Sequence, residues 1–229
     1  MKRIGLLGGM SWESSIEYER LINTEVRRRL GGVHSADLII RSYDFATIEA
    51  LQASGGWKAA GAMLAEDAVH LERAGAEIIL LCTVTMHRVA PAIEAAISVD
   101  FLHLADATAT AVVSTGIGTV GLLGTRYTME HEFYRERLER AGLEVRVPEP
   151  DDRDLIHGVI FDELVQGEIR PGSRERFVTV MERMVGEGSQ GVIAGCTEIE
   201  LLVGPADVPC PYFPTTALHA MAAVDAALA

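Results

Sequence analysis

The chain has 229 residues, of which 48% are hydrophobic and 23% charged, a composition that supports a buried core and excludes disorder as the main state. The 33 acidic residues outnumber the 20 Lys and Arg residues, which gives a formal net charge of −13. A surface this acidic repels nucleic acid and anionic membranes, so we expect neither as a partner.

The chain start shows no targeting pattern, and no apolar run approaches the roughly 18 residues that a membrane helix needs. Three cysteines, Cys82, Cys196 and Cys210, lie far apart and are odd in number. They predict no disulfide framework and indicate a reducing, cytoplasmic setting.

Apolar runs alternate with amphipathic stretches along the whole chain. We predict strands at 4–7, 36–40, 77–81, 120–123, 145–147 and 191–194, and helices at 16–30, 56–74, 130–141 and 173–187. Nearly continuous apolar strands that alternate with helices predict an α/β fold, with parallel sheets covered by helices on both faces.

The second half of the chain repeats landmarks of the first in the same order. Residues 4–8 match 120–124, and residues 78–83 around Cys82 match 192–197 around Cys196. Residues 101–102 and 212–213 each begin a further strand-then-helix unit. We therefore predict two pseudo-symmetric domains, one from 1–99 plus 211–229 and the other from 100–210, with the active site in the cleft between them.

Two glycine-rich segments have different interpretations. The loop from Gly8 to Ser11 follows a strand, so its backbone N–H groups are expected to bind an anion. The segment 116–121 has the spacing of a dinucleotide-binding loop, but it precedes a strand, so we interpret it as a helix end and a turn.

Cys82 and Cys196 are each expected at the carboxyl end of a strand, and each is followed by a threonine that suits a helix N-cap. A helix N-terminus lowers the pKa of a thiol, so we expect thiolate near neutral pH. A thiolate and a thiol on opposite faces of one carbon can invert it by proton transfer. Cys210 lies between two prolines and is interpreted as structural.

Neither a metal nor pyridoxal phosphate is expected. The seven histidines lack metal-ligand spacing, although His87 lies one helical turn beyond Cys82. Pyridoxal phosphate needs a lysine to form its Schiff base, and the residues around Lys2 and Lys58 do not have the pattern of a cofactor site.

Four segments together resemble the aspartate/glutamate racemase family, most closely its bacterial branch acting on L-aspartate and L-glutamate. They are the residues 5–14, 81–87, 122–129 and 195–199. The resemblance implies two pseudo-symmetric α/β domains, no cofactor, an amino-acid substrate, a homodimer and a two-thiol 1,1-proton transfer by Cys82 and Cys196. It also implies substrate-binding residues: Thr83, Val84, Thr85, Thr197 and Glu198 for the α-carboxylate and ammonium, and Met10, Ser11, Gln52 and Thr125 for the remainder.

Val84 departs from the family pattern, which usually has asparagine at this position. Valine keeps the backbone N–H but lacks an amide contact worth about 1–3 kcal/mol. Alternatives therefore remain: a racemase for a less polar substrate, or a weakly active paralogue that binds a small carboxylate. Related folds also act as hydantoin racemases, malonate-derivative decarboxylases or maleate isomerases.

Overall fold

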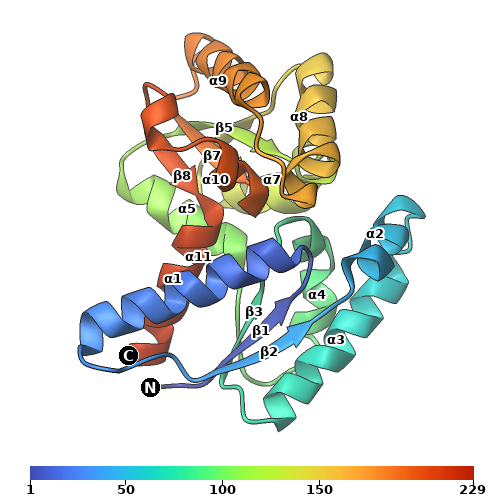
Figure 1. The fold of residues 1–229 in the computed structure, drawn as a ribbon, viewed down its shortest axis with the longest axis vertical. Helices are drawn as coiled ribbons and strands as arrows, with labels where there is room; N and C mark the ends of the chain where they lie inside the picture. The colour runs from blue at the N-terminus through green and yellow to red at the C-terminus, as the bar shows by residue number, and fades with distance from the viewer. The chain divides into compact units, whose positions relative to one another are not determined.

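The computed structural model describes all of residues 1–229 and divides into two compact units. The first unit contains Met1–Leu104 and His219–Ala229, and the second contains Ala105–Leu218. Each unit has one four-stranded parallel sheet, in the order β2-β1-β3-β4 in the first and β6-β5-β7-β8 in the second. The equivalent order confirms the predicted α/β fold with two similar halves (Figure 1).

The six predicted strands are present, with limits within two residues of those expected. The strands are β1 (Ile4–Gly8), β2 (Leu38–Ser42), β3 (Ile78–Leu81), β4 (Asp100–Leu102), β5 (Thr119–Gly124), β6 (Glu144–Arg146), β7 (Gly191–Gly195) and β8 (Tyr212–Pro214). Gly116 has a φ of 76° between α5 and β5, which confirms that segment 116–121 leads from a helix end through a turn into a strand.

The four predicted helices are also present, although the region 130–141 is divided between two helices. The helices are α1 (Trp12–Leu30), α2 (Phe45–Ala53), α3 (Trp57–Arg73), α4 (Ala90–Glu94), α5 (Leu104–Ser114), α6 (Arg126–Glu130), α7 (Glu132–Arg140), α8 (Pro150–Asp162), α9 (Pro171–Gly186), α10 (Thr197–Leu202) and α11 (Thr215–Leu228). None of them is both long and apolar enough to cross a lipid bilayer. The prediction missed α8, although Pro150 at its first turn and the acidic residues that follow are start signals.

Alternating side chains divide the core of the first unit into two layers. Leu6 and Leu80 pack with α1 and α11, whereas Leu7 and Leu81 pack with α3 on the opposite face. Figure 1 shows these helices on either side of the sheet. Because both faces are covered, β1 and β3 are apolar throughout, as their sequences predict.

The predicted domain limits are 1–99 plus 211–229 for one domain and 100–210 for the other. They differ from the observed units at both places where the chain passes from one unit to the other. Strand β4 pairs with β3, so residues 100–104 belong to the first unit. Strand β8 pairs with β7, so residues 211–218 belong to the second. The helices that follow these strands then change unit: α5 lies almost wholly in the second, and most of α11 in the first.

Candidate active site in two halves

Cys82 is the first residue after β3. Its backbone N–H donates to the carbonyl of Leu7 at 2.9 Å, which continues the pairing of β1 and β3. The side chain has no exposed surface and belongs to the apolar cluster that includes Tyr18 and Ala223. Burial raises the pKa of the Cys82 thiol well above its ordinary value, because the thiolate would lose its hydration.

The chain turns tightly after Cys82 without the expected threonine cap. The Thr83 N–H donates to the Leu81 carbonyl at 2.9 Å, and Ser14 Oγ donates to the Cys82 carbonyl at 3.0 Å. Only a five-residue 3₁₀ helix, Thr85–Val89, follows, and its N-cap is Val84, with no side-chain bond. The expected cap is therefore wrong here, because Thr83 lies within the preceding turn. The role of Ser14 was missed, and no pattern in the sequence signals it.

The loop between β1 and α1 is held by its own serines. The Gly9 N–H donates to Ser15 Oγ at 2.6 Å, and Ser11 Oγ accepts from the Ser14 N–H at 3.4 Å as the N-cap of α1. The Gly9 N–H therefore already has Ser15 as its partner, and anion binding by the loop stays a prediction. Ser11 and Met10 are both buried.

Gln52 reaches from α2 to the helix that follows the Cys82 turn. Its Nε2 lies 3.2 Å from Met86 Sδ, and its side chain is buried. Thr85 and Val84, on the same turn, are buried too. Met10 and Met86 belong to one apolar cluster. The first unit therefore gathers the predicted residues of the first half around the ends of β1 and β3.

Cys196 follows β7 and is the N-cap of α10, and 9% of its surface is exposed. Its Sγ donates to Glu198 Oε2 at 2.8 Å. Burial raises the pKa of the Cys196 thiol far above its ordinary value, and the nearby Glu198 carboxylate raises it further. The expected lowering of both thiol pKa values is therefore wrong, because desolvation outweighs two short helix ends.

Further predicted residues of the second unit lie beside Cys196. Gly124 and Gly195 are register partners in β5 and β7, so Thr125 and Cys196 follow neighbouring strands at the same sheet edge. Thr125 is the N-cap of α6, and its Oγ1 accepts from the Thr128 N–H at 3.3 Å.

One residue missed by the sequence analysis, Thr216, supports α10 from the start of α11. Thr216 Oγ1 donates a hydrogen bond to Thr197 Oγ1 at 2.9 Å, and the Thr216 N–H donates to Glu200 Oε1 at 2.8 Å. A buried pair of threonines directly after an apolar strand is a signal that could have identified Thr216. Thr197 and Glu198 are themselves buried.

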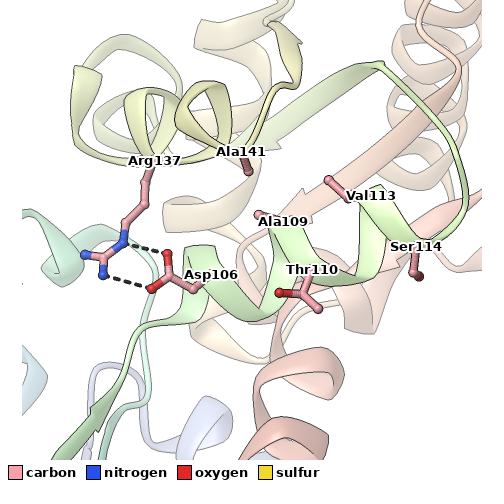
Figure 2. Close-up of a pocket in the computed structure, with 7 residues that line it drawn as sticks. All are labelled: Asp106, Ala109, Thr110, Val113, Ser114, Arg137 and Ala141. Carbon is pink, nitrogen blue, oxygen red and sulfur yellow. Dashed lines mark hydrogen bonds and ion pairs between the residues drawn. The ribbon is translucent and has the colours of Figure 1, made fainter.

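The second unit also has a hollow of about 460 Å³ between α5 and the end of α7. Figure 2 shows Asp106 and Arg137 paired at one end of it, with Ala109 and Val113 farther along α5. The pair is joined by hydrogen bonds of 2.7 and 2.8 Å. None of the predicted site residues lines it. The hollow is therefore separate from the candidate thiol sites.

The model of the Asp/Glu/Hydantoin racemase family matches residues 7–223, a span that includes both cysteine turns and every strand except the first three residues of β1. The chain belongs to this family. Membership in the Asp/Glu/Hydantoin racemase family identifies the chain as a racemase-type enzyme.

Two solved structures match this chain over its whole length. A candidate Asp/Glu racemase from Yersinia pestis is 51% identical with a TM-score of 0.94, and the match covers 100% of both chains. An aspartate racemase homologue from Pyrococcus horikoshii is 33% identical with a TM-score of 0.86, again over 100% of both chains.

A more distant match separates fold from reaction. Unliganded arylmalonate decarboxylase is 14% identical with a TM-score of 0.53, over 99% of this chain and 93% of that chain. At this identity the likeness concerns the fold alone. The racemase-family fold therefore does not by itself choose between proton transfer and decarboxylation.

Proposed function

We propose that this chain is a cofactor-independent amino-acid racemase that acts on aspartate or glutamate, with Cys82 and Cys196 as the base and acid of a 1,1-proton transfer. One observation carries the proposal. Cys82 directly follows β3 and Cys196 directly follows β7, which occupy the same position in two sheets of equivalent order. Family membership supports the racemase class.

The chemistry requires one thiolate and one thiol on opposite faces of a bound substrate. The thiolate takes the α-proton as the Cα–H bond breaks, and the opposing thiol gives its proton to the other face, so the two sulfurs exchange protonation states. Burial raises both thiol pKa values, which makes each thiolate, once formed, a stronger base toward a weakly acidic α-proton. Hydrogen-bond donors must stabilise the carbanionic transition state.

Glu198 is the acceptor nearest to one of these thiols. Its Oε2 accepts from Cys196 Sγ at 2.8 Å and raises the pKa of this thiol, so the contact favours the protonated form of Cys196, which serves as the acid. The sequence analysis assigned Glu198 to substrate binding. In the proposal it acts on the thiol, while Thr83, Thr85 and Thr197 are left to bind the α-carboxylate and ammonium.

The substrate assignment rests on the names of the two similar structures and on the polar residues near the thiols. Met10, Ser11, Gln52 and Thr125 are proposed to contact the substrate side chain. A cytoplasmic homodimer remains part of the proposal. Size-exclusion chromatography with light scattering should give twice the chain mass of 24.7 kDa.

Val84 favours a second candidate, a racemase for a less polar substrate or a hydantoin. The side chain is 4% exposed on the Cys82 turn and has no hydrogen-bonding group. A panel of amino acids and hydantoins separates the candidates, because only the true substrate should exchange its α-proton. Release of carbon dioxide from a malonate derivative would instead indicate a decarboxylase.

The deciding experiment is α-proton exchange in D2O, followed by NMR and polarimetry for each enantiomer of aspartate and glutamate. The wild type should incorporate deuterium and lose optical activity. Cys82→Ala and Cys196→Ala should each abolish racemisation. Each variant should still exchange the α-proton of one enantiomer, because one base remains, and the enantiomer should differ between the two variants. Cys210→Ala is the matched control and should be active. Racemisation at the wild-type rate by either single variant would refute the two-thiol mechanism.

A further inference from the structure

We propose that His87 is a positioning residue that fixes the Cys82–Thr83 turn by tying it to the chain leaving β4. The inference rests on the proposed function and adds to it a residue outside the predicted catalytic and substrate-binding set. His87 does not act on the substrate in this proposal; it acts through the turn.

The ring of His87 joins two backbone groups that are distant in the sequence. Its Nδ1 lies 2.7 Å from the carbonyl oxygen of Thr83, the residue after Cys82. Its Nε2 accepts from the N–H of Leu104 at 3.2 Å, where α5 begins. A single side chain therefore ties the candidate thiol turn to the end of β4.

These two bonds define the state of the ring. A carbonyl oxygen can only accept, so Nδ1 must carry the proton, and a backbone N–H can only donate, so Nε2 must present its lone pair. The geometry therefore requires a neutral imidazole in the Nδ1–H form. A protonated ring would present a second N–H to the Leu104 donor and break that bond.

Aromatic neighbours hold the ring in this orientation. His87 is 2% exposed, and its centroid lies 4.5 Å from that of His103 and 5.9 Å from that of Phe101. The ring of His219 lies 5.9 Å away, and its Nε2 donates to the carbonyl of Leu102 at 2.8 Å. Two histidines thus bind the end of β4, and His87 alone of the two reaches the Cys82 turn.

The Cys82 turn carries only one of the two proposed bases. A change in this turn should therefore alter the rate of proton transfer at one face of the substrate only. A misplacement of about 1 Å can cost on the order of a hundredfold in rate. Loosening the Cys82 turn should therefore slow proton removal from the enantiomer that Cys82 deprotonates, while substrate binding and the Cys196 half-reaction change little. A merely structural role would reduce both half-reactions together.

The test compares His87→Ala and His87→Asn with the exposed control His34→Ala. The Cys196→Ala variant, which keeps Cys82 as the one base, first identifies the enantiomer that Cys82 serves. For that enantiomer, kcat for deuterium exchange should fall roughly tenfold or more in His87→Ala. KM should stay within about twofold, and His87→Asn, whose amide can still donate to Thr83, should recover part of the loss. His34→Ala should match the wild type.

A second measurement does not depend on activity. Nitrogen-15 NMR of the wild-type protein should show a protonated Nδ1 and an unprotonated Nε2 for His87. An Nε2–H form, or equal slowing of both enantiomers by His87→Ala in a folded protein, would overturn the positioning role. Wild-type racemisation rates in Cys82→Ala and Cys196→Ala would refute the proposed function instead, and would leave the NMR result standing.

Discussion

The three cysteines differ sharply in their exposure, and this difference bears directly on the proposed chemistry. Cys82 has no exposed surface, 9% of Cys196 is exposed, and Cys210 is only partly buried. Burial raises the pKa of all three thiols, so none is a thiolate in the resting protein at neutral pH. A substrate can reach Cys82 only after the side chains that cover it have moved.

Alkylation should follow the order of exposure. With iodoacetamide under native conditions, Cys210 should be modified first, Cys196 more slowly and Cys82 last, because the reagent needs both access and thiolate. Peptide mass spectrometry over time measures all three rates in one sample. If Cys82 were modified as fast as Cys210, its buried position would be wrong. In Cys210→Ala the order of the other two should persist.

His219 should make folding stability depend on pH. The ring is fully buried between Tyr18 Oη and the Leu102 carbonyl, each at 2.8 Å, and burial lowers its pKa to about 4 from an ordinary 6.5. The unfolded chain therefore binds a proton that the folded chain does not between pH 6.5 and 4. Stability should be complete above pH 6.5 and fall by about 3 kcal/mol as the pH drops to 4.

Urea unfolding at pH 7 and pH 4.5 measures this effect. Acidic groups also lose stabilising partners in acid, so the informative quantity is the difference between the wild type and His219→Gln. The variant should lose less stability on acidification than the wild type, although it is less stable at pH 7. The exposed His34→Gln should show the wild-type dependence. An unchanged pH dependence in His219→Gln would contradict a neutral buried ring.

At the scale of single elements, the approach of the Gly8–Ser11 loop to β2 depends on one glycine. Gly9 has a φ of 80°, and a Cβ there would clash with the backbone nitrogen and oxygen of Tyr43. The Tyr43 N–H donates to the Gly8 carbonyl at 3.0 Å in the same place. The backbone of Tyr43, the residue after β2, therefore leaves no room for a side chain at residue 9.

Gly9→Ala should accordingly destabilise the protein much more than Gly31→Ala. Gly31 has a φ of 77°, but a Cβ there would meet nothing within 4 Å. Backbone strain at positive φ costs about 1–2 kcal/mol, and the clash in Gly9→Ala should add at least another 2 kcal/mol. Chemical denaturation of both variants gives the comparison. Equal losses of unfolding free energy in the two variants would mean that the loop moves to relieve the clash and that only the positive φ angle is costly.

At the scale of the whole molecule, the first unit is completed by a helix from the end of the chain. Ala220, Ala223 and Val224 of α11 pack against Leu6 and Leu80 of the first sheet. Residues 1–104 alone would expose this apolar face. The two units therefore depend on chain segments that are distant in the sequence.

A chain truncated after Leu218 should lose the cooperative folding of the first unit while the second keeps its sheet. Both tryptophans, Trp12 and Trp57, lie in the first unit, so their fluorescence reports on it alone. Fluorescence-detected unfolding should shift to lower denaturant, whereas circular dichroism should retain a later transition from the second unit. Coincident wild-type transitions by both probes would show that α11 is dispensable.

The sequence by itself determined the strand and helix pattern, the equivalence of the two halves and the family to which the chain belongs. These features lie in contiguous residues, such as the apolar runs of β1 and β3 or the turns at Cys82 and Cys196, so side-chain periodicity and short motifs predict them. The four predicted helices follow from the same local signals.

Only the tertiary structure decided the unit to which β4 and β8 belong, the burial that raises the thiol pKa values, and the contacts of Glu198 and His87. Strand pairing, desolvation and a bond such as that from Leu104 to His87 depend on residues that meet only after folding. The helix ends after the cysteines suggested thiolates, but the packing around each sulfur is the stronger effect, and no local pattern encodes it.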